Sequence, residues 1–249
     1  MRTEYLKKTT AEVTIGEAFL RREPCIMMIN VAIDGPAGAG KSTISKEVAA
    51  RLSFIYVDTG ALYRAIGLYA LRKGIGTKNE PQILSMLEDI TVELKLVNGA
   101  QRVFLCGEDV SEYIRTPQVS MAASDVSAIK GVRDFLLSLQ RDIARENDVI
   151  MDGRDIGTVV LPDAKIKIFL TASAEERAMR RYLELREKGE EVIYEEILSD
   201  IVKRDRNDSN RTIAPLKPAG DSIIIDTTGN ELPKSIDILY AAIKERLGV

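Results

Sequence analysis

Residues 35–43 read GPAGAGKST and match the pattern G-x-x-x-x-G-K-[ST] between an apolar run and a helical segment. In such a loop, glycines let successive backbone N–H groups converge on phosphate oxygens, and the N-terminus of the following helix adds positive charge. The side chain of Lys41 supplies a mobile cation, and the hydroxyl of Ser42 is the expected ligand for Mg²⁺. The sequence therefore predicts a site for a phosphate-rich nucleotide at Gly35, Pro36, Ala37, Gly38, Ala39, Gly40, Lys41, Ser42 and Thr43.

Three classes of protein share this loop: motor or transporter ATPases, GTPase switches and small-molecule kinases. An ATPase should carry an acidic residue beside the strand-end aspartate, but Gly153 follows Asp152 in the segment VIMDGRD. A GTPase should carry Asn-Lys-x-Asp for guanine, and no asparagine here is followed by lysine. The segment DTTG at 226–229 matches a switch motif, but four residues carry little information. These features favour phosphoryl transfer to an acceptor other than water.

The chain contains no histidine, which excludes Ser-His-Asp triads, Cys-His dyads and histidine metal ligands. A phosphorylated acceptor needs no general base, because its attacking oxygen is already an anion. It needs cations that hold two anions in line, and arginine suits phosphate because its planar fork binds two oxygens. Arginines at predicted strand ends and on late helices are Arg64, Arg133, Arg154, Arg177, Arg180, Arg181, Arg204 and Arg211.

Two of these arginines, Arg177 and Arg181, share a helix face at i and i+4. We expect them to close over the triphosphate from a lid at about 173–205. A solvated face, with Glu176 paired to Arg180, is the alternative interpretation.

A second set, Arg204, Asp208 and Arg211, also falls on one helix face, at i, i+4 and i+7. This spacing predicts a site, although a structural ion pair between Arg204 and Asp208 would explain the first two residues.

The composition is that of an ordinary globular protein, with 45% hydrophobic residues and a net charge of −3. We therefore expect no nucleic-acid partner. Cys25 and Cys106 lie far apart and predict neither a disulfide framework nor a zinc site. Charges interrupt every apolar run before the roughly 20 residues of a membrane span, and the N-terminus resembles no signal or transit peptide. We expect a cytoplasmic protein that contacts no membrane.

The elements that must position these side chains alternate between strand and helix from Met28 onward. Such alternation predicts a parallel sheet covered by helices on both faces. Ser173 and Glu176 predict a capping box at the start of the helix that runs to Lys188. Expected strands are 28–33, 54–57, 149–153, 165–172 and 222–226, and expected helices are 41–52, 61–74, 132–147, 173–188, 194–208 and 231–247.

Residues 81–127 interrupt this alternation. TVELKLV and QRVFLCG alternate around Asn98-Gly99-Ala100, which predicts a hairpin in an inserted subdomain. Residues 1–27 precede the first convincing core element, and either Met27 or Met28 would serve as a start. We interpret them as an over-long start or a mobile arm, with a functional docking arm as the alternative.

Five segments together resemble the bacterial cytidylate kinase family, over residues 28–249 and including the hairpin insert. The resemblance implies an α/β fold of the P-loop NTPase type, with a five-stranded parallel sheet, a nucleoside-monophosphate-binding insert and a short mobile lid. It also implies ATP- and Mg²⁺-dependent phosphorylation of CMP and dCMP. The segments are GPAGAGKST, DTGALYR at 58–64, DGRDIGT at 152–158, SAEERAMRR at 173–181 and RDRNDSNRTIAPL at 204–216.

The same resemblance implies roles for individual residues. Thr59, which replaces the serine of many relatives and keeps its hydroxyl, is expected near the acceptor phosphate with Arg64 and Arg154. Ser124, Arg133 and Asp155 are expected near cytosine, Arg204 and Asp208 near the ribose, and Arg211 beside the phosphates. The expected catalytic residues are Lys41, Arg154, Arg177, Arg181 and Arg211. For Asp155, bracing Arg154 or organising magnesium is an open alternative. The family usually lacks a segment like residues 1–27.

Other functions remain open from the sequence. Adenylate kinases typically carry DGFPR where this chain has DGRD, and a longer lid. Thymidylate kinase or another nucleoside monophosphate kinase is the enzymatic alternative, and a non-catalytic nucleotide-binding protein is the alternative of a different class. We expect no obligate protein partner.

Overall fold

The main sheet of the computed structural model, which describes residues 28–97 and 100–248, has five parallel strands. Their order is β2-β6-β1-β7-β8, which confirms the expected parallel architecture. Strand β1 lies at the centre of the sheet and is buried on both faces, which explains the apolar run from Val31 to Ile33. The strands are β1 (Asn30–Asp34), β2 (Ile55–Asp58), β6 (Val149–Gly153), β7 (Ile166–Thr171) and β8 (Ile223–Asp226).

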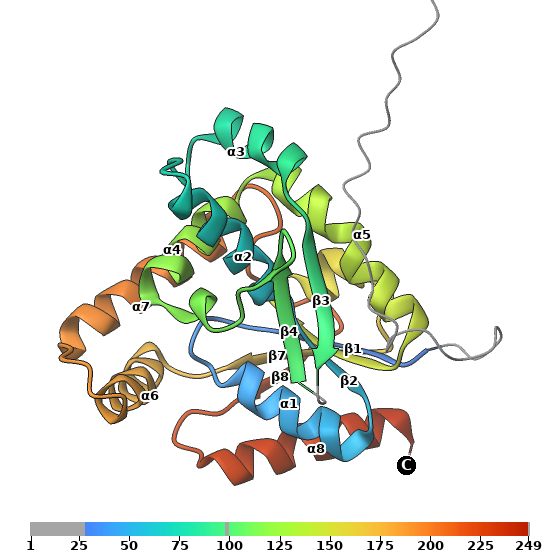
Figure 1. The fold of residues 1–249 in the computed structure, drawn as a ribbon. Helices are drawn as coiled ribbons and strands as arrows, with labels where there is room; N and C mark the ends of the chain where they lie inside the picture. The colour runs from blue at the N-terminus through green and yellow to red at the C-terminus, as the bar shows by residue number, and fades with distance from the viewer. Residues whose placement is uncertain (1–27, 98–99, 249) are drawn as a thin grey trace, which may run out of the picture.

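Helices cover both faces of this sheet, as Figure 1 shows. Helices α1 and α8 lie on one side, α2, α4 and α5 lie on the other, and α6 and α7 pack together at one end. They are α1 (Lys41–Leu52), α2 (Thr59–Arg72), α4 (Pro117–Val126), α5 (Lys130–Glu146), α6 (Ala174–Glu187), α7 (Tyr194–Asn210) and α8 (Leu232–Leu247). Each expected helix is present, and α4 is an addition within the expected insert. No helix of the described residues is long and apolar enough to span a bilayer.

The sheet separates two apolar clusters. The first joins α2 and α5 to the insert through residues such as Leu62, Leu136 and Val103. The second joins α1 to α8 through residues such as Ile44 and Leu239. Each fully buried aliphatic side chain contributes about 1.5–3 kcal/mol, so both layers are firmly attached to the sheet.

The insert contains a second, antiparallel sheet of order β3-β4-β5. Val97 pairs with Ala100, which confirms the expected hairpin, although its turn residues Asn98 and Gly99 lie outside the described residues. The third strand and the short helices were not expected from the sequence. The elements are α3 (Glu80–Met86), the 3₁₀ helix η2 (Leu87–Asp89), β3 (Val92–Val97), β4 (Ala100–Leu105), β5 (Glu108–Asp109) and the 3₁₀ helix η3 (Tyr113–Arg115).

Helix α6 begins with half of the expected capping box. The Ser173 hydroxyl accepts a hydrogen bond from the Glu176 N–H at 3.1 Å. The reciprocal bond was expected wrongly, because the Glu176 carboxylate pairs with Arg180 and the Ser173 N–H donates to Thr228. Residues 1–27, for which we expected a dispensable start or an arm, lie outside the described residues.

A buried carboxylate connects the end of β1 to the segment after β6. The carboxylate oxygens of Asp34 accept hydrogen bonds from the N–H groups of Ile156 and Gly157, at 2.7 and 2.8 Å. These groups begin η4 (Ile156–Val160), a single π-helical turn that directly follows Asp155. Burial raises the pKa of Asp34 from 3.8 to about 6, despite these two hydrogen bonds.

We predict that the contribution of Asp34 to the free energy of unfolding decreases as pH rises. Because its folded-state pKa lies above its unfolded value, its contribution is most favourable below about pH 4 and is lost as pH rises through about 6. Asp34→Asn removes this titration, so the melting temperature of the wild type relative to the variant should fall between pH 4.5 and 7. The expected change is about 2–3 kcal/mol, or several degrees.

Asp226→Asn is the matched control. Hydrogen bonds from the Thr228 hydroxyl and N–H lower the pKa of Asp226 below 3.8, so its contribution to stability is complete above that pH. The difference in melting temperature between wild type and Asp226→Asn should therefore stay nearly constant between pH 4.5 and 7. Melting curves without nucleotide measure both. Identical pH slopes for wild type and Asp34→Asn would contradict the prediction.

Candidate active site

A cleft of about 580 Å³ opens at the carboxyl ends of the main strands, a size typical of small-molecule sites. Its lining includes nine lysine or arginine side chains and five aspartate or glutamate side chains. This excess of positive charge favours anionic ligands. Apart from Gly35 and Pro36, every site residue expected from the sequence lines the cleft.

Lys41 lies at the first position of α1, inside the glycine-rich loop. Its ammonium group donates hydrogen bonds to the carbonyls of Gly35 and Pro36, at 2.8 and 2.7 Å. Burial, together with repulsion from Arg154, lowers the pKa of Lys41.

Gly35 is required here because its φ is 151° and an added Cβ would lie 1.9 Å from the carbonyl oxygen of Leu170.

Ser42 and Asp152 form the pair most suited to a divalent cation. The Ser42 hydroxyl donates to one carboxylate oxygen of Asp152 at 2.9 Å, and the other carboxylate oxygen is buried without a hydrogen-bond partner. Burial and the neighbouring carboxylate of Asp58 raise the pKa of Asp152. Hydroxyl and carboxylate oxygens are the donors that Mg²⁺ prefers, so these residues fit that ion.

Asp152 was considered only as a strand-end residue, and its pairing with Ser42 was not expected. Within the described residues, no group of three or more acidic or cysteine side chains could hold a metal alone.

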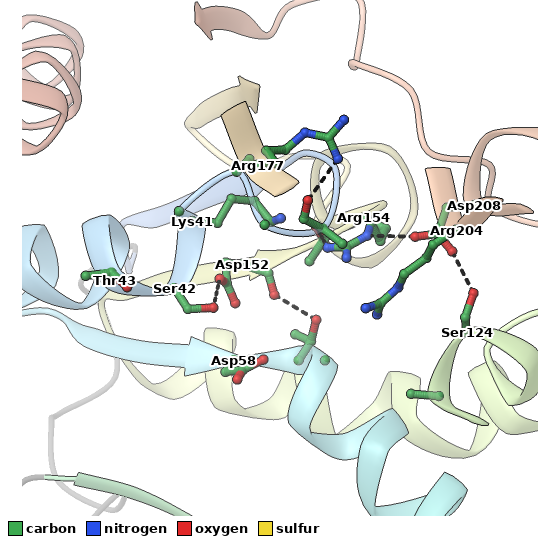
Figure 2. Close-up of a pocket in the computed structure, with 18 of the residues that line it drawn as sticks. Lys41, Ser42, Thr43, Asp58, Ser124, Asp152, Arg154, Arg177, Arg204 and Asp208 are labelled. Atoms are coloured by element: carbon green, nitrogen blue, oxygen red, sulfur yellow. Dashed lines mark hydrogen bonds and ion pairs between the residues drawn. The ribbon is translucent and has the colours of Figure 1, made fainter. Parts of the chain in front are cut away.

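A network of ionic side chains crosses the other half of the cleft. As Figure 2 shows, Arg154 donates to Asp208 at 3.0 Å, and Asp208 accepts a further hydrogen bond from Ser124 at 3.1 Å. Thr59 donates to the Asp152 carbonyl at 2.8 Å. Asp208 therefore pairs with Arg154, the residue that directly follows β6. The alternative ion pair between Arg204 and Asp208 does not form among the described residues.

Asp155 is buried between two arginines from different elements. Arg133 of α5 donates to one of its oxygens, and a guanidinium nitrogen of Arg211 lies 3.5 Å from the other. Arg211 was expected on the helix face of Arg204. Instead α7 ends at Asn210, and the extended backbone of Arg211 turns its side chain toward Asp155. Asp155 accordingly braces Arg133 and Arg211 rather than Arg154.

Several guanidinium groups in the cleft retain unused donors. The Nε atoms of Arg64 and Arg204 are buried without a hydrogen-bond partner. The Arg211 nitrogen that lies 3.5 Å from Asp155 makes an ion pair with it but no hydrogen bond. Burial and the nearby Arg154 lower the pKa of Arg204 to about 10. Buried donors without partners are unfavourable, and phosphate oxygens are acceptors that would satisfy them.

The two arginines expected to share a role in the lid have different surroundings. Arg177 is 4% exposed and donates to the carbonyls of Ala37 and Ala172, both at 2.9 Å, and to Asp205 at 2.6 Å. It therefore ties α6 to the glycine-rich loop and to α7. The side chain of Arg181 is 29% exposed and pairs with Glu184 on its own helix.

Sequence reasoning missed the wall of the cleft beyond the glycine-rich loop. Asn230, Leu232 and Ser235 line it. Arg180, which also lines the cleft, donates to the Thr227 carbonyl at 2.9 Å. The strand-to-helix junction after Asp226 is the signal that could have found them, since carboxyl ends of parallel strands share one edge.

We predict that replacing Arg177 lowers the melting temperature much more than replacing Arg181 does. Arg177→Ala leaves two carbonyls and the Asp205 carboxylate without their partner, so the melting temperature should fall by several degrees, or about 3 kcal/mol. Arg181→Ala should change it by less than about one degree, because its ion pair is exposed. Thermal melts of both variants measure this, and equal losses would show that Arg177 is no tether.

Comparison with known proteins matches this chain to one family. The family model described as cytidylate kinase matches residues 31–245. A cytidylate kinase from Caldicellulosiruptor saccharolyticus is 56% identical over 219 residues, which cover 86% of this chain and 97% of the relative. A cytidylate kinase from Geobacter sulfurreducens is 50% identical over 216 residues, with coverages of 87% and 93%.

Solved structures were matched as well. Shikimate kinase from Bacteroides thetaiotaomicron has 15% identity and a TM-score of 0.43, with coverages of 89% and 99%. These values are too low to bear on function. The family model and the close relatives span nearly the whole described fold, and the chain belongs to the cytidylate kinase family.

Proposed function

We propose that this chain transfers the terminal phosphoryl group of ATP to CMP and dCMP, forming ADP with CDP or dCDP. The observation that carries this proposal is the cleft with nine cationic side chains, three of which have buried donors that make no hydrogen bond. ATP and a nucleoside monophosphate are both polyanions, and their reacting phosphates repel each other. Cations held in place on both sides offset this repulsion.

We place the triphosphate of ATP on the glycine-rich loop. The backbone N–H groups of residues 37–43 and the N-terminus of α1 would hold the phosphate oxygens, and Lys41 would follow the transferring group. The donor nucleoside would lie toward Leu232 and Asn230, which also line the cleft. Ser42 and Asp152 would hold Mg²⁺, which supplies charge neutralisation between the phosphates when bound.

The acceptor phosphate would lie between Arg64, Arg154 and Arg211, beside the Thr59 hydroxyl. One of its oxygens attacks the terminal phosphorus of ATP, and the bond from that phosphorus to the bridging oxygen of ADP breaks. The electron pair and charge pass to ADP. The attacking oxygen carries no proton, so the absence of histidine does not impede this step.

The base would lie beside Ser124, Arg133 and Asp155, and the ribose near Arg204 and Asp208. Arg133 and Arg211 hold the Asp155 carboxylate in place. A carboxylate accepts hydrogen bonds only, so it matches the exocyclic amino group of cytosine and meets a carbonyl oxygen in uracil.

The remaining assignments concern the parts of the chain around the cleft. Within the 28–249 kinase domain, residues 81–127 would form the acceptor-binding insert and residues 173–205 a lid. Arg181 would reach the triphosphate as the lid closes, so Arg181→Ala should lower kcat more than it raises KM for CMP. ATP, CMP and dCMP are freely diffusing substrates, which suits a cytoplasmic enzyme.

A coupled assay of ADP release tests this function directly. CMP and dCMP should support turnover that exceeds that with UMP, AMP, GMP and dTMP and that requires Mg²⁺. Lys41→Ala should lower turnover more than about a hundredfold while keeping the melting temperature, because this cation acts on transition-state charge. Lys46→Ala, an exposed lysine on the same helix, is the control and should behave as wild type. Equal turnover with every nucleotide, or activity of Lys41→Ala within tenfold of wild type, would refute the assignment.

We predict that Asp155 sets the preference for cytosine over uracil. In Asp155→Asn the amide can turn either end toward the base, so kcat/KM for CMP should fall while that for UMP falls less. The preference for CMP should narrow by at least about tenfold, since an unmatched buried acceptor costs roughly 1–3 kcal/mol.

Asp208→Asn is the control for this experiment, because Asp208 is also buried and paired with an arginine but lies at the ribose end of the proposed acceptor site. It should lower kcat/KM for CMP and UMP alike. An unchanged CMP to UMP ratio in Asp155→Asn would leave Asp155 with a bracing role only.

A further inference from the structure

A glutamine of the insert forms hydrogen bonds with the backbone of the main sheet. Gln101 lies in β4, opposite Leu96 of β3. Its side-chain oxygen accepts a hydrogen bond from the Asp58 N–H at 2.9 Å, and its side-chain nitrogen donates to the Asp58 carbonyl at 3.4 Å. This contact joins the insert to Asp58, the last residue of β2. Strands β2 and β4 lie side by side in Figure 1.

Strand β2 is the edge strand of the main sheet, so the outward backbone groups of Asp58 have no neighbouring strand. The Gln101 amide supplies the donor and the acceptor that such a strand would provide. The amide does both through two separate atoms, whereas a carboxylate accepts but does not donate and an aliphatic side chain does neither. Asparagine is shorter by one methylene group.

The Asp58 side chain orients two groups at the start of α2. One oxygen accepts a hydrogen bond from the Ala61 N–H at 3.1 Å and caps the helix, and the other accepts from Arg64 at 2.6 Å. Burial alone would raise the pKa of Asp58, but Arg64 and Arg115 hold it below its ordinary value. The Asp58 carboxylate therefore stays ionised and keeps Arg64 in place.

We propose that Gln101 is a positioning residue for the acceptor phosphate. Gln101 holds the backbone of Asp58, and the Asp58 carboxylate holds the Arg64 guanidinium. The orientation of Arg64 therefore depends on the contact between the insert and β2. Gln101 does not line the cleft, so its effect passes through Asp58. The inference rests on the proposed function, in which Arg64 binds the acceptor phosphate.

Gln101→Met tests the inference, because methionine keeps the length of the side chain and removes both hydrogen bonds. KM for CMP should rise about tenfold, while KM for ATP and kcat stay within twofold, since only acceptor binding loses an oriented cation. Arg102→Met is the matched control. It removes ion pairs with Asp109 and Glu112 inside the insert, at the next position of the same strand, and should leave KM for CMP unchanged.

A selective rise in KM for CMP of more than threefold over the control supports the inference. A smaller rise, or an equal rise in KM for ATP, overturns it. Should Gln101→Met not fold, Gln101→Glu keeps the acceptor for the Asp58 N–H, loses the donor, and is judged by the same threshold.

Hydrogen exchange at residues 55–64 gives a readout without turnover. Exchange at the Asp58 amide should accelerate in Gln101→Met and not in Arg102→Met, and equal rates would overturn the inference. Wild-type enzyme that released no ADP with CMP would refute the proposed function instead, and the exchange experiment would still decide whether Gln101 holds Asp58.

Discussion

Mutual repulsion of like charges is the constraint on which this cleft depends. Nine cationic side chains line a cleft of about 580 Å³. Several of them are largely removed from water, and charges repel each other more strongly in such surroundings than in water. Three of them are held by different acceptors. Arg177 uses backbone carbonyls and Asp205, Arg154 uses Asp208, and Arg133 uses Asp155. The donors that remain without partners then belong to side chains that face the cleft.

The parallel sheet places carboxylates among these cations. The paired strands β2 and β6 bring Asp58 and Asp152 into register, and β1 ends in Asp34 next to Gly153. Three acidic side chains thus meet at one edge, yet they act on different partners. Asp34 holds η4, Asp58 holds Arg64, and Asp152 holds Ser42.

Sequence patterns predict the parts of this structure that depend on local chemistry. The glycine-rich loop, the buried strands and the Ser173 cap follow from residue types and spacing, so they could be read directly. Contacts between segments distant in the chain could not. Asp34 reaches Gly157 across 123 positions and Arg177 reaches Ala37 across 140, and neither pairing leaves a periodic signal. Arg211 was misplaced because helical spacing does not report where a helix ends.

The two apolar clusters on opposite faces of the sheet support different halves of the cleft. The cluster on α1 and α8 supports the glycine-rich loop and the wall near Leu232, whereas the cluster on α2 and α5 includes the insert and supports Arg64 and Arg133. Strand residues contribute alternately, with Val31 and Ile33 in one cluster and Ala32 in the other. If ATP and CMP bind as proposed, repacking of one layer during evolution would change the site of one substrate and leave the side chains around the other in place.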